Sequence, residues 1–171
     1  MKVKTNEICL YGILGTLTFV LKLIMAPLPN IEPVSLLMIV YTIVFGIKAI
    51  YPLIVYVILE IVFYGFGLWS VGYLYIWLVL VIATNSIYSI KHSTNTLLWS
   101  TVSGIYGLMV GMLYIPLYVI SGGATFAIGW WISGISYDIT HGIANFILCA
   151  TLFQPITKLL FTLKKQYKIN D

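Results

Sequence analysis

The chain has 171 residues, 61% hydrophobic and 8% charged, and its mean hydropathy of +1.03 excludes a water-soluble globular domain. A spanning helix needs about 20 mostly apolar residues, so this length accommodates about six spans in one membrane domain, residues 1–171. The net charge of +4 comes from lysine with no arginine at all, which removes bidentate phosphate recognition, so no nucleic-acid partner is expected.

Apolar runs broken at proline, glycine and charged residues predict the helices. In chain order the predicted spans are 8–25, 33–46, 49–66, 71–90, 96–120 and 126–163. The second run is short for a span, and Pro33 suits its first helical turn. All connections are short, so the expected fold is an all-α integral membrane bundle of six transmembrane helices.

The lysines predict the orientation of this bundle. With six spans, eight of the nine lysines fall on one side: Lys2, Lys4, Lys48, Lys91, Lys158, Lys164, Lys165 and Lys168. The positive-inside rule then places both termini in the cytoplasm, in a multi-pass protein of the cell membrane. Lys22 is the exception, near the outer end of the first span, where it either reaches the lipid headgroups or lies beside a substrate.

The last predicted span carries a polar stripe. At 100° per residue, five residues lie within roughly 60° of Asp138 around the helix: Trp131, Gly134, His141, Asn145 and Cys149. An ionisable group near the bilayer centre costs about 2.5–3.5 kcal/mol on insertion scales. The stripe must therefore face protein or water.

Two other spans offer matching faces. Glu60 lies in the middle of the third span beside Tyr56 and Tyr64, at a depth similar to that of Asp138. On the fifth span Tyr114 shares a face with small residues, which let a neighbouring helix or ligand approach. Trp77, Tyr114 and Trp131 are candidate pocket walls, whereas Trp69, Tyr73 and Trp130 fall where an interfacial aromatic belt is expected.

Several interpretations of these polar residues are open. A binding cavity is favoured, because intramembrane ionisable residues usually serve a function. The same residues could simply pack against one another, or Asp138 and His141 could form the acid–base pair of a small membrane enzyme. A metal site is weaker, because only one histidine lies at depth. The sequence contains no HExxH, GxSxG or phosphate-loop motif, so no cofactor is expected.

Two segments point to a family: LPNIEPVSLLMIVYTIVFG, residues 28–46, and WWISGISYDITHGIANFILCATLFQP, residues 130–155. With the six-span format, they make the chain resemble the substrate-binding membrane subunit, or S component, of energy-coupling factor (ECF) vitamin transporters. The likeness covers essentially the whole chain. It implies the capture of a scarce water-soluble vitamin or a vitamin-like compound on the outer side.

The resemblance also implies partners and roles. An S component assembles in the bilayer with a shared transmembrane coupling subunit and two cytoplasmic ATPase subunits, so the chain itself is not expected to be an enzyme. The loop 26–33 corresponds to the family's lid, which makes Asn30 and Glu32 lid candidates, although an ordinary exposed turn is the alternative. Gly12 and Thr16 replace the usual alanine pair that contacts the coupling subunit.

Together these arguments predict one substrate-binding set, expected to face a shared hollow: Asn30, Glu32, Glu60, Trp77, Tyr114, Trp131, Asp138, His141 and Asn145.

Overall fold

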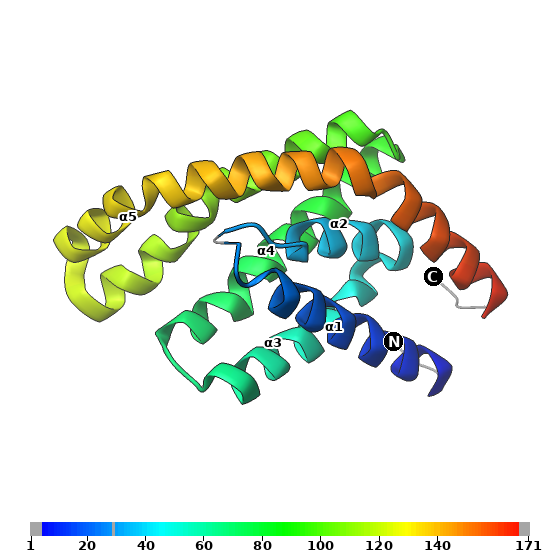
Figure 1. Cartoon of the computed structure of the whole chain (residues 1–171), viewed down its shortest axis with the longest axis horizontal. Helices are drawn as coiled ribbons and strands as arrows, with labels where there is room; N and C mark the ends of the chain where they lie inside the picture. The colour runs from blue at the N-terminus through cyan, green and yellow to red at the C-terminus, as the bar shows by residue number, and fades with distance from the viewer. Residues whose placement is uncertain (1–4, 29, 168–171) are drawn as a thin grey trace.

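A computed structural model describes residues 5–28 and 30–167, and this part of the chain consists of helices joined by short connections, with no strand. The helices are α1 (Thr5–Met25), α2 (Val34–Phe45), α3 (Ile50–Tyr64), α4 (Leu68–Lys91) and α5 (Thr96–Gln166), and a short 3-10 helix, η1 (Gly46–Ala49), joins α2 to α3 (Figure 1). The all-α prediction is therefore confirmed.

The predicted count of six spans is not confirmed. Among the described residues, four helical stretches are long and apolar enough to cross a membrane: Thr5–Met25, Val34–Tyr64, Leu68–Lys91 and Thr96–Gln166. The helices were expected to be interrupted at residues 47–48 and at residues 121–125. Instead η1 carries the chain from α2 into α3, and α5 continues through residues 121–125 with a single non-helical residue, Gly123.

Glycine explains why no loop is needed at either point. Gly46 has φ 61° and Gly123 has φ 83°, a backbone conformation that costs glycine little and other residues considerably more. One residue therefore redirects the chain, and the helix restarts at once. Composition predicted the positions of both breaks but not how short they would be.

The two halves of α5 fold back on each other at Gly123 and run side by side, as the yellow bend and the adjoining orange and green ribbons of Figure 1 show. Small residues allow this contact. A Cβ added to Gly107 would lie 2.8 Å from the Cα of Gly142, and one added to Gly142 would lie 3.0 Å from the carbonyl oxygen of Gly104. The halves thus meet nearly backbone to backbone.

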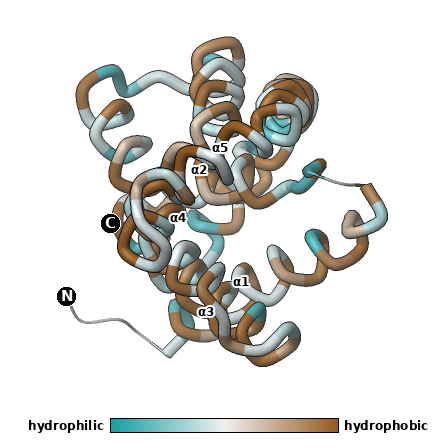
Figure 2. The backbone as a smooth tube through the Cα atoms, turned by 90° about the vertical axis from the view of Figure 1, so that its left-hand side faces the viewer, coloured by the Kyte–Doolittle hydropathy of each residue, from teal (hydrophilic) through white to brown (hydrophobic). Residues whose placement is uncertain are grey.

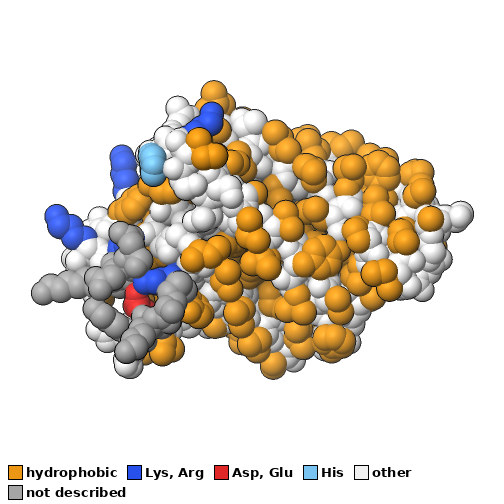
Figure 3. All heavy atoms as spheres, turned by 180° about the vertical axis from the view of Figure 1, so that it is seen from behind, with side chains coloured by type: hydrophobic (Ala, Val, Ile, Leu, Met, Phe, Trp, Pro, Cys, Tyr) orange, Lys and Arg blue, Asp and Glu red, His pale blue; other side chains and the backbone are white. Residues whose placement is uncertain are grey.

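The core centres on α2, all of whose residues are buried, against α4 and α5. The outer faces of the other helices are apolar as well, with Ile13 65%, Val62 77% and Ile143 57% exposed. Figure 2 shows hydrophobic colour along most of the helical backbone, and Figure 3 shows apolar side chains covering most of one face. A surface of this kind suits contact with lipid chains rather than water.

The start of α1 and the end of α5 lie at the same end of the molecule (Figure 1), and Figure 3 shows lysines gathered there. Lys48 Nζ lies 3.0 Å from Glu7 Oε1, and Lys164 donates to the carbonyl of Val44 at 2.8 Å. Three other lysines used in the orientation prediction, Lys2, Lys4 and Lys168, lie outside the described residues. Lys22 lies toward the opposite end of α1.

Candidate functional site

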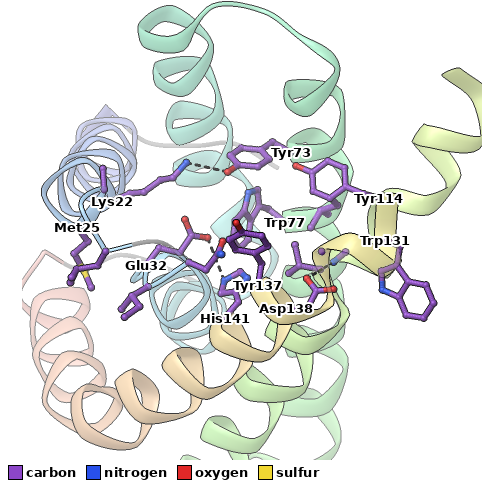
Figure 4. Close-up of a pocket in the computed structure, with 18 of the residues that line it drawn as sticks. Lys22, Met25, Glu32, Tyr73, Trp77, Tyr114, Trp131, Tyr137, Asp138 and His141 are labelled. Atoms are coloured by element: carbon purple, nitrogen blue, oxygen red, sulfur yellow. Dashed lines mark hydrogen bonds and ion pairs between the residues drawn. The ribbon is translucent and has the colours of Figure 1, made fainter. Parts of the chain in front are cut away.

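A cavity of about 590 Å³ lies beside the C-terminal end of α1, away from the two ends of the chain. Its walls come from the last turn of α1, the loop 26–33, the first half of α4 and both halves of α5 (Figure 4). Most of the predicted substrate-binding set lines it: Asn30, Glu32, Trp77, Tyr114, Trp131, Asp138 and His141. The volume is typical of small-molecule sites.

The loop 26–33 contributes Glu32, which approaches the last helical segment. Glu32 Oε1 lies 3.6 Å from His141 Nε2, and Figure 4 shows the two side chains pointing toward each other across the cavity. The Glu32 side chain is 14% exposed, and burial raises the pKa of its carboxyl, while the nearby Lys22 ammonium opposes this rise. Asn30 adopts a left-handed φ of 57°, which asparagine tolerates, and this directs the loop back over the cavity.

Asp138 is positioned by the fold-back of α5. Its Oδ1 accepts a hydrogen bond from the backbone N–H of Gly111 at 3.1 Å, and a Cβ on Gly111 would collide with the carboxylate. The Trp131 side chain also comes within hydrogen-bonding reach of this carboxyl, although Oδ2 makes no well-aligned hydrogen bond among the described residues. Asp138 is therefore contacted from both halves of α5.

Aromatic rings form the opposite wall. Tyr73 and Trp77 pack edge to face with ring centres 5.8 Å apart, and Tyr114 and Trp130 do the same at 5.8 Å. Trp77 is 2% exposed, and its indole N–H finds no acceptor in the residues that the structure describes. An unpaired buried donor costs about 1–3 kcal/mol, which a ligand acceptor would relieve. Trp131 lies at the other side of the cavity, beside Asp138 (Figure 4).

Lys22 lies at the edge of the cavity, in contact with α3 and α4. Its Nζ donates to Glu60 Oε2 at 2.7 Å and to the hydroxyl of Tyr73 at 3.1 Å, and it lies 4.9 Å from the centre of the Tyr73 ring. Glu60 is 2% exposed and does not line the cavity. Its carboxylate is the counter-ion of Lys22 rather than part of the wall.

Asn145 is likewise placed outside the cavity. Its amide donates to Ser35 Oγ at 2.9 Å, which joins the second half of α5 to α2. The sequence grouped it with Asp138 because the two residues share a helix face, but the cavity covers only the part of that face nearer Gly123. Two of the nine predicted residues, Glu60 and Asn145, therefore lie outside the cavity lining.

Some residues that line the cavity were not predicted to do so from the sequence. Tyr73 and Trp130 were assigned to an interfacial belt, yet both line the cavity. The signal for Tyr73 was present, because Trp69, Tyr73 and Trp77 follow one another at four-residue spacing and contact one another edge to face along α4. Tyr137 also lines the cavity and had no signal, since it lies one residue from Asp138 and about 100° around the helix from it.

A second, shallower hollow lies on the outer face of α1. It contains Cys9, Gly12, Ile13, Thr16, Leu17 and Val20. A Cβ added to Gly12 would meet nothing within 4 Å, whereas one on Gly15, on the inner face, would lie 2.6 Å from the carbonyl oxygen of Pro52. The predicted partner-contact pair, Gly12 and Thr16, therefore forms an open groove on the surface.

Comparison with known proteins does not assign the chain to a family. The chain matches no protein-family model, no curated protein and no solved structure. Across residues 5–28 and 30–167, no three histidine, cysteine, aspartate or glutamate side chains come together as a metal site would require.

Proposed function

We propose that this protein is the substrate-capture subunit, or S component, of an energy-coupling factor importer, and that it binds a small water-soluble vitamin or vitamin-like compound for ATP-driven uptake. The cavity carries this proposal. A ligand-sized hollow lined by aromatic rings, two carboxyl groups and unpartnered buried polar atoms, with a loop that carries Asn30 and Glu32 on one side, is the arrangement that a capture site requires. The resemblance of residues 28–46 and 130–155 to S components supplies the transport context.

The arrangement in the membrane follows from helix lengths. At 1.5 Å per residue, α5 would extend over roughly 105 Å, far more than the hydrocarbon core of about 30 Å, so its halves must cross separately. Helix α2 alone covers about 18 Å, too little for a lipid-facing span, but it is wholly surrounded by protein and needs no lipid contact. We infer six crossings, with α2 and α3 counted separately.

The lysine-rich end is proposed to face the cytoplasm, with both termini. The cavity then opens outward, at the end where a scarce external nutrient would enter. ATP hydrolysis would belong to the two ATPase subunits, and the groove of α1 would contact the transmembrane coupling subunit. Gly12 is suited to this contact because it leaves room for close helix packing.

Substitution of Gly12 by leucine should abolish assembly without damaging the fold. The leucine would fill the groove, but apart from its own helix no atom of the described residues lies within 4 Å of its Cβ. Co-expression with the coupling and ATPase subunits, followed by affinity purification of the coupling subunit, measures the assembly. The matched control is Gly129→Leu, another helical glycine with open space around its Cβ, which should still assemble. Equal recovery of both variants would remove the groove from the proposed interface.

The capture role predicts that the protein purified in mild detergent retains a small molecule, visible by native mass spectrometry. His141→Ala should reduce its occupancy, because a lost buried hydrogen bond weakens binding by about 1–3 kcal/mol. His92→Asn is the control, because His92 ends α4 with a left-handed φ of 46° that asparagine tolerates.

The same purification separates the alternatives. A small membrane enzyme using Asp138 and His141 would convert a substrate without partner subunits, and a purely structural protein would purify empty. An empty wild-type protein that also fails to recruit the coupling subunit would contradict the proposed function.

A further inference from the structure

The charges around the cavity do not balance. Within the described part of the chain, the formally charged side chains that line it are Lys22, Glu32 and Asp138. The positive charge of Lys22 is already neutralised by Glu60, which lies 2.7 Å away. Two carboxylates therefore remain, and the His141 ring nitrogen approaches Glu32 to 3.6 Å. Buried carboxylates without a counter-ion are costly, so the site favours a positive partner.

The same charges disfavour an anionic ligand. To pair with Lys22 it would have to draw the ammonium away from Glu60 Oε2. The Glu60 side chain is 2% exposed, and its other oxygen, Oε1, already has no hydrogen-bond partner among the described residues. The anion would also lie beside Glu32 and Asp138. Each of these effects opposes binding, so a carboxylate or phosphate group does not suit this cavity.

The shape and the remaining polar atoms define the rest of the ligand. Edge-to-face pairs of Tyr73 with Trp77 and of Tyr114 with Trp130 present aromatic surfaces against which a flat ring can pack. A cation near such rings gains further attraction. The buried N–H of Trp77 has no acceptor among the described residues, and Asp138 Oδ2 can accept a further hydrogen bond beside the one that Trp131 offers.

We propose that the ligand is a flat heteroaromatic cation, with a protonated nitrogen or amidine-like edge directed at Glu32 and Asp138 and a ring acceptor directed at Trp77. This inference rests on the proposed function, because it names the substrate class of the same cavity. It excludes carboxylated and phosphorylated forms of such a ring as substrates.

Three probes of one shape test the assignment: 2-naphthamidine, 2-naphthamide and 2-naphthoate, which carry a positive, no and a negative charge on the same ring system. Binding to the purified full-length chain, freed of any retained molecule, is measured by tryptophan fluorescence and isothermal calorimetry. The amidine should bind at least about tenfold more tightly than the naphthoate, with the amide between them. Glu32→Gln and Asp138→Asn, which keep side-chain shape, should each reduce the preference for the amidine.

His92→Asn, at the far end of α4 from the cavity, should leave the order of the three probes unchanged. Equal or tighter binding of naphthoate, binding of none of the probes, or an unchanged preference in both carboxylate variants would overturn the assignment. These results leave the proposed function intact where a retained molecule and assembly with the coupling subunit are still observed. Loss of those two observations would instead reject the capture role itself.

Discussion

Replacing Lys22 by methionine should lower the free energy of unfolding by about 3–5 kcal/mol, because it leaves Glu60 buried without a counter-ion. The Glu60 side chain is 2% exposed, and its Oε2 accepts from Lys22 at 2.7 Å. The substitution also removes the hydrogen bond from Lys22 to the hydroxyl of Tyr73. Titration of the purified protein with SDS in mixed micelles, followed by tryptophan fluorescence, measures the loss.

The double variant Lys22→Met with Glu60→Gln should recover most of this loss, since no net charge then remains at the site. Comparing the single variants with the double variant also decides between the two interpretations of Lys22 that the sequence left open. A lysine that only reached the lipid headgroups would make Lys22→Met nearly neutral. Equal destabilisation in the single and double variants would show that Lys22 acts through packing rather than through its charge.

Gly107→Ala should destabilise the fold by about 1–3 kcal/mol, because the added methyl has no space. It would lie 2.8 Å from the Cα of Gly142 and 2.9 Å from Asn145 Nδ2, and backbone atoms cannot move aside as a flexible side chain can. The two halves of α5 would have to separate, and the Asn145 bond to Ser35 would be strained as well. Thermal unfolding monitored by size-exclusion chromatography measures the effect.

Gly129→Ala is the matched control on the same helix. Nothing lies within 4 Å of a Cβ at Gly129, so the alanine should stabilise the helix by up to about 1 kcal/mol through its higher helix propensity. The two substitutions therefore change stability in opposite directions. If both variants unfolded at the wild-type temperature, the close contact between the halves of α5 would not contribute to stability.

The helical nature of the chain was predictable, and so were most helix boundaries, because apolar runs and their interruptions are local properties. The first predicted span, 8–25, differs from α1 by three residues at its start, and the fourth, 71–90, differs from α4 by a similar amount. The number of separate stretches was not predictable. Whether a glycine ends a helix or only redirects it depends on the packing on both sides.

The candidate site was likewise predictable in part, where a pattern within one helix indicated it. Rotation around one helix grouped Asp138 with His141, and both line the cavity. The partnership between Lys22 and Glu60 joins residues 38 positions apart on α1 and α3, and no periodicity within either helix indicates it. The role of Gly111 was hidden as well, because it depends on how the halves of α5 meet across the Gly123 turn. Pattern within a helix can be read from sequence, whereas pairing between helices cannot.

The two ion pairs of α1 have a mechanical consequence. Glu7 near its start is bound to Lys48 in η1, and Lys22 near its end is bound to Glu60 in α3, so α1 is pinned to the same neighbouring unit at points about 22 Å apart along its axis. Sliding α1 alone would break both pairs at once. A widening of the cavity that separated α1 from α3 would have to break these ion pairs, so they favour movement of α1 and α3 together.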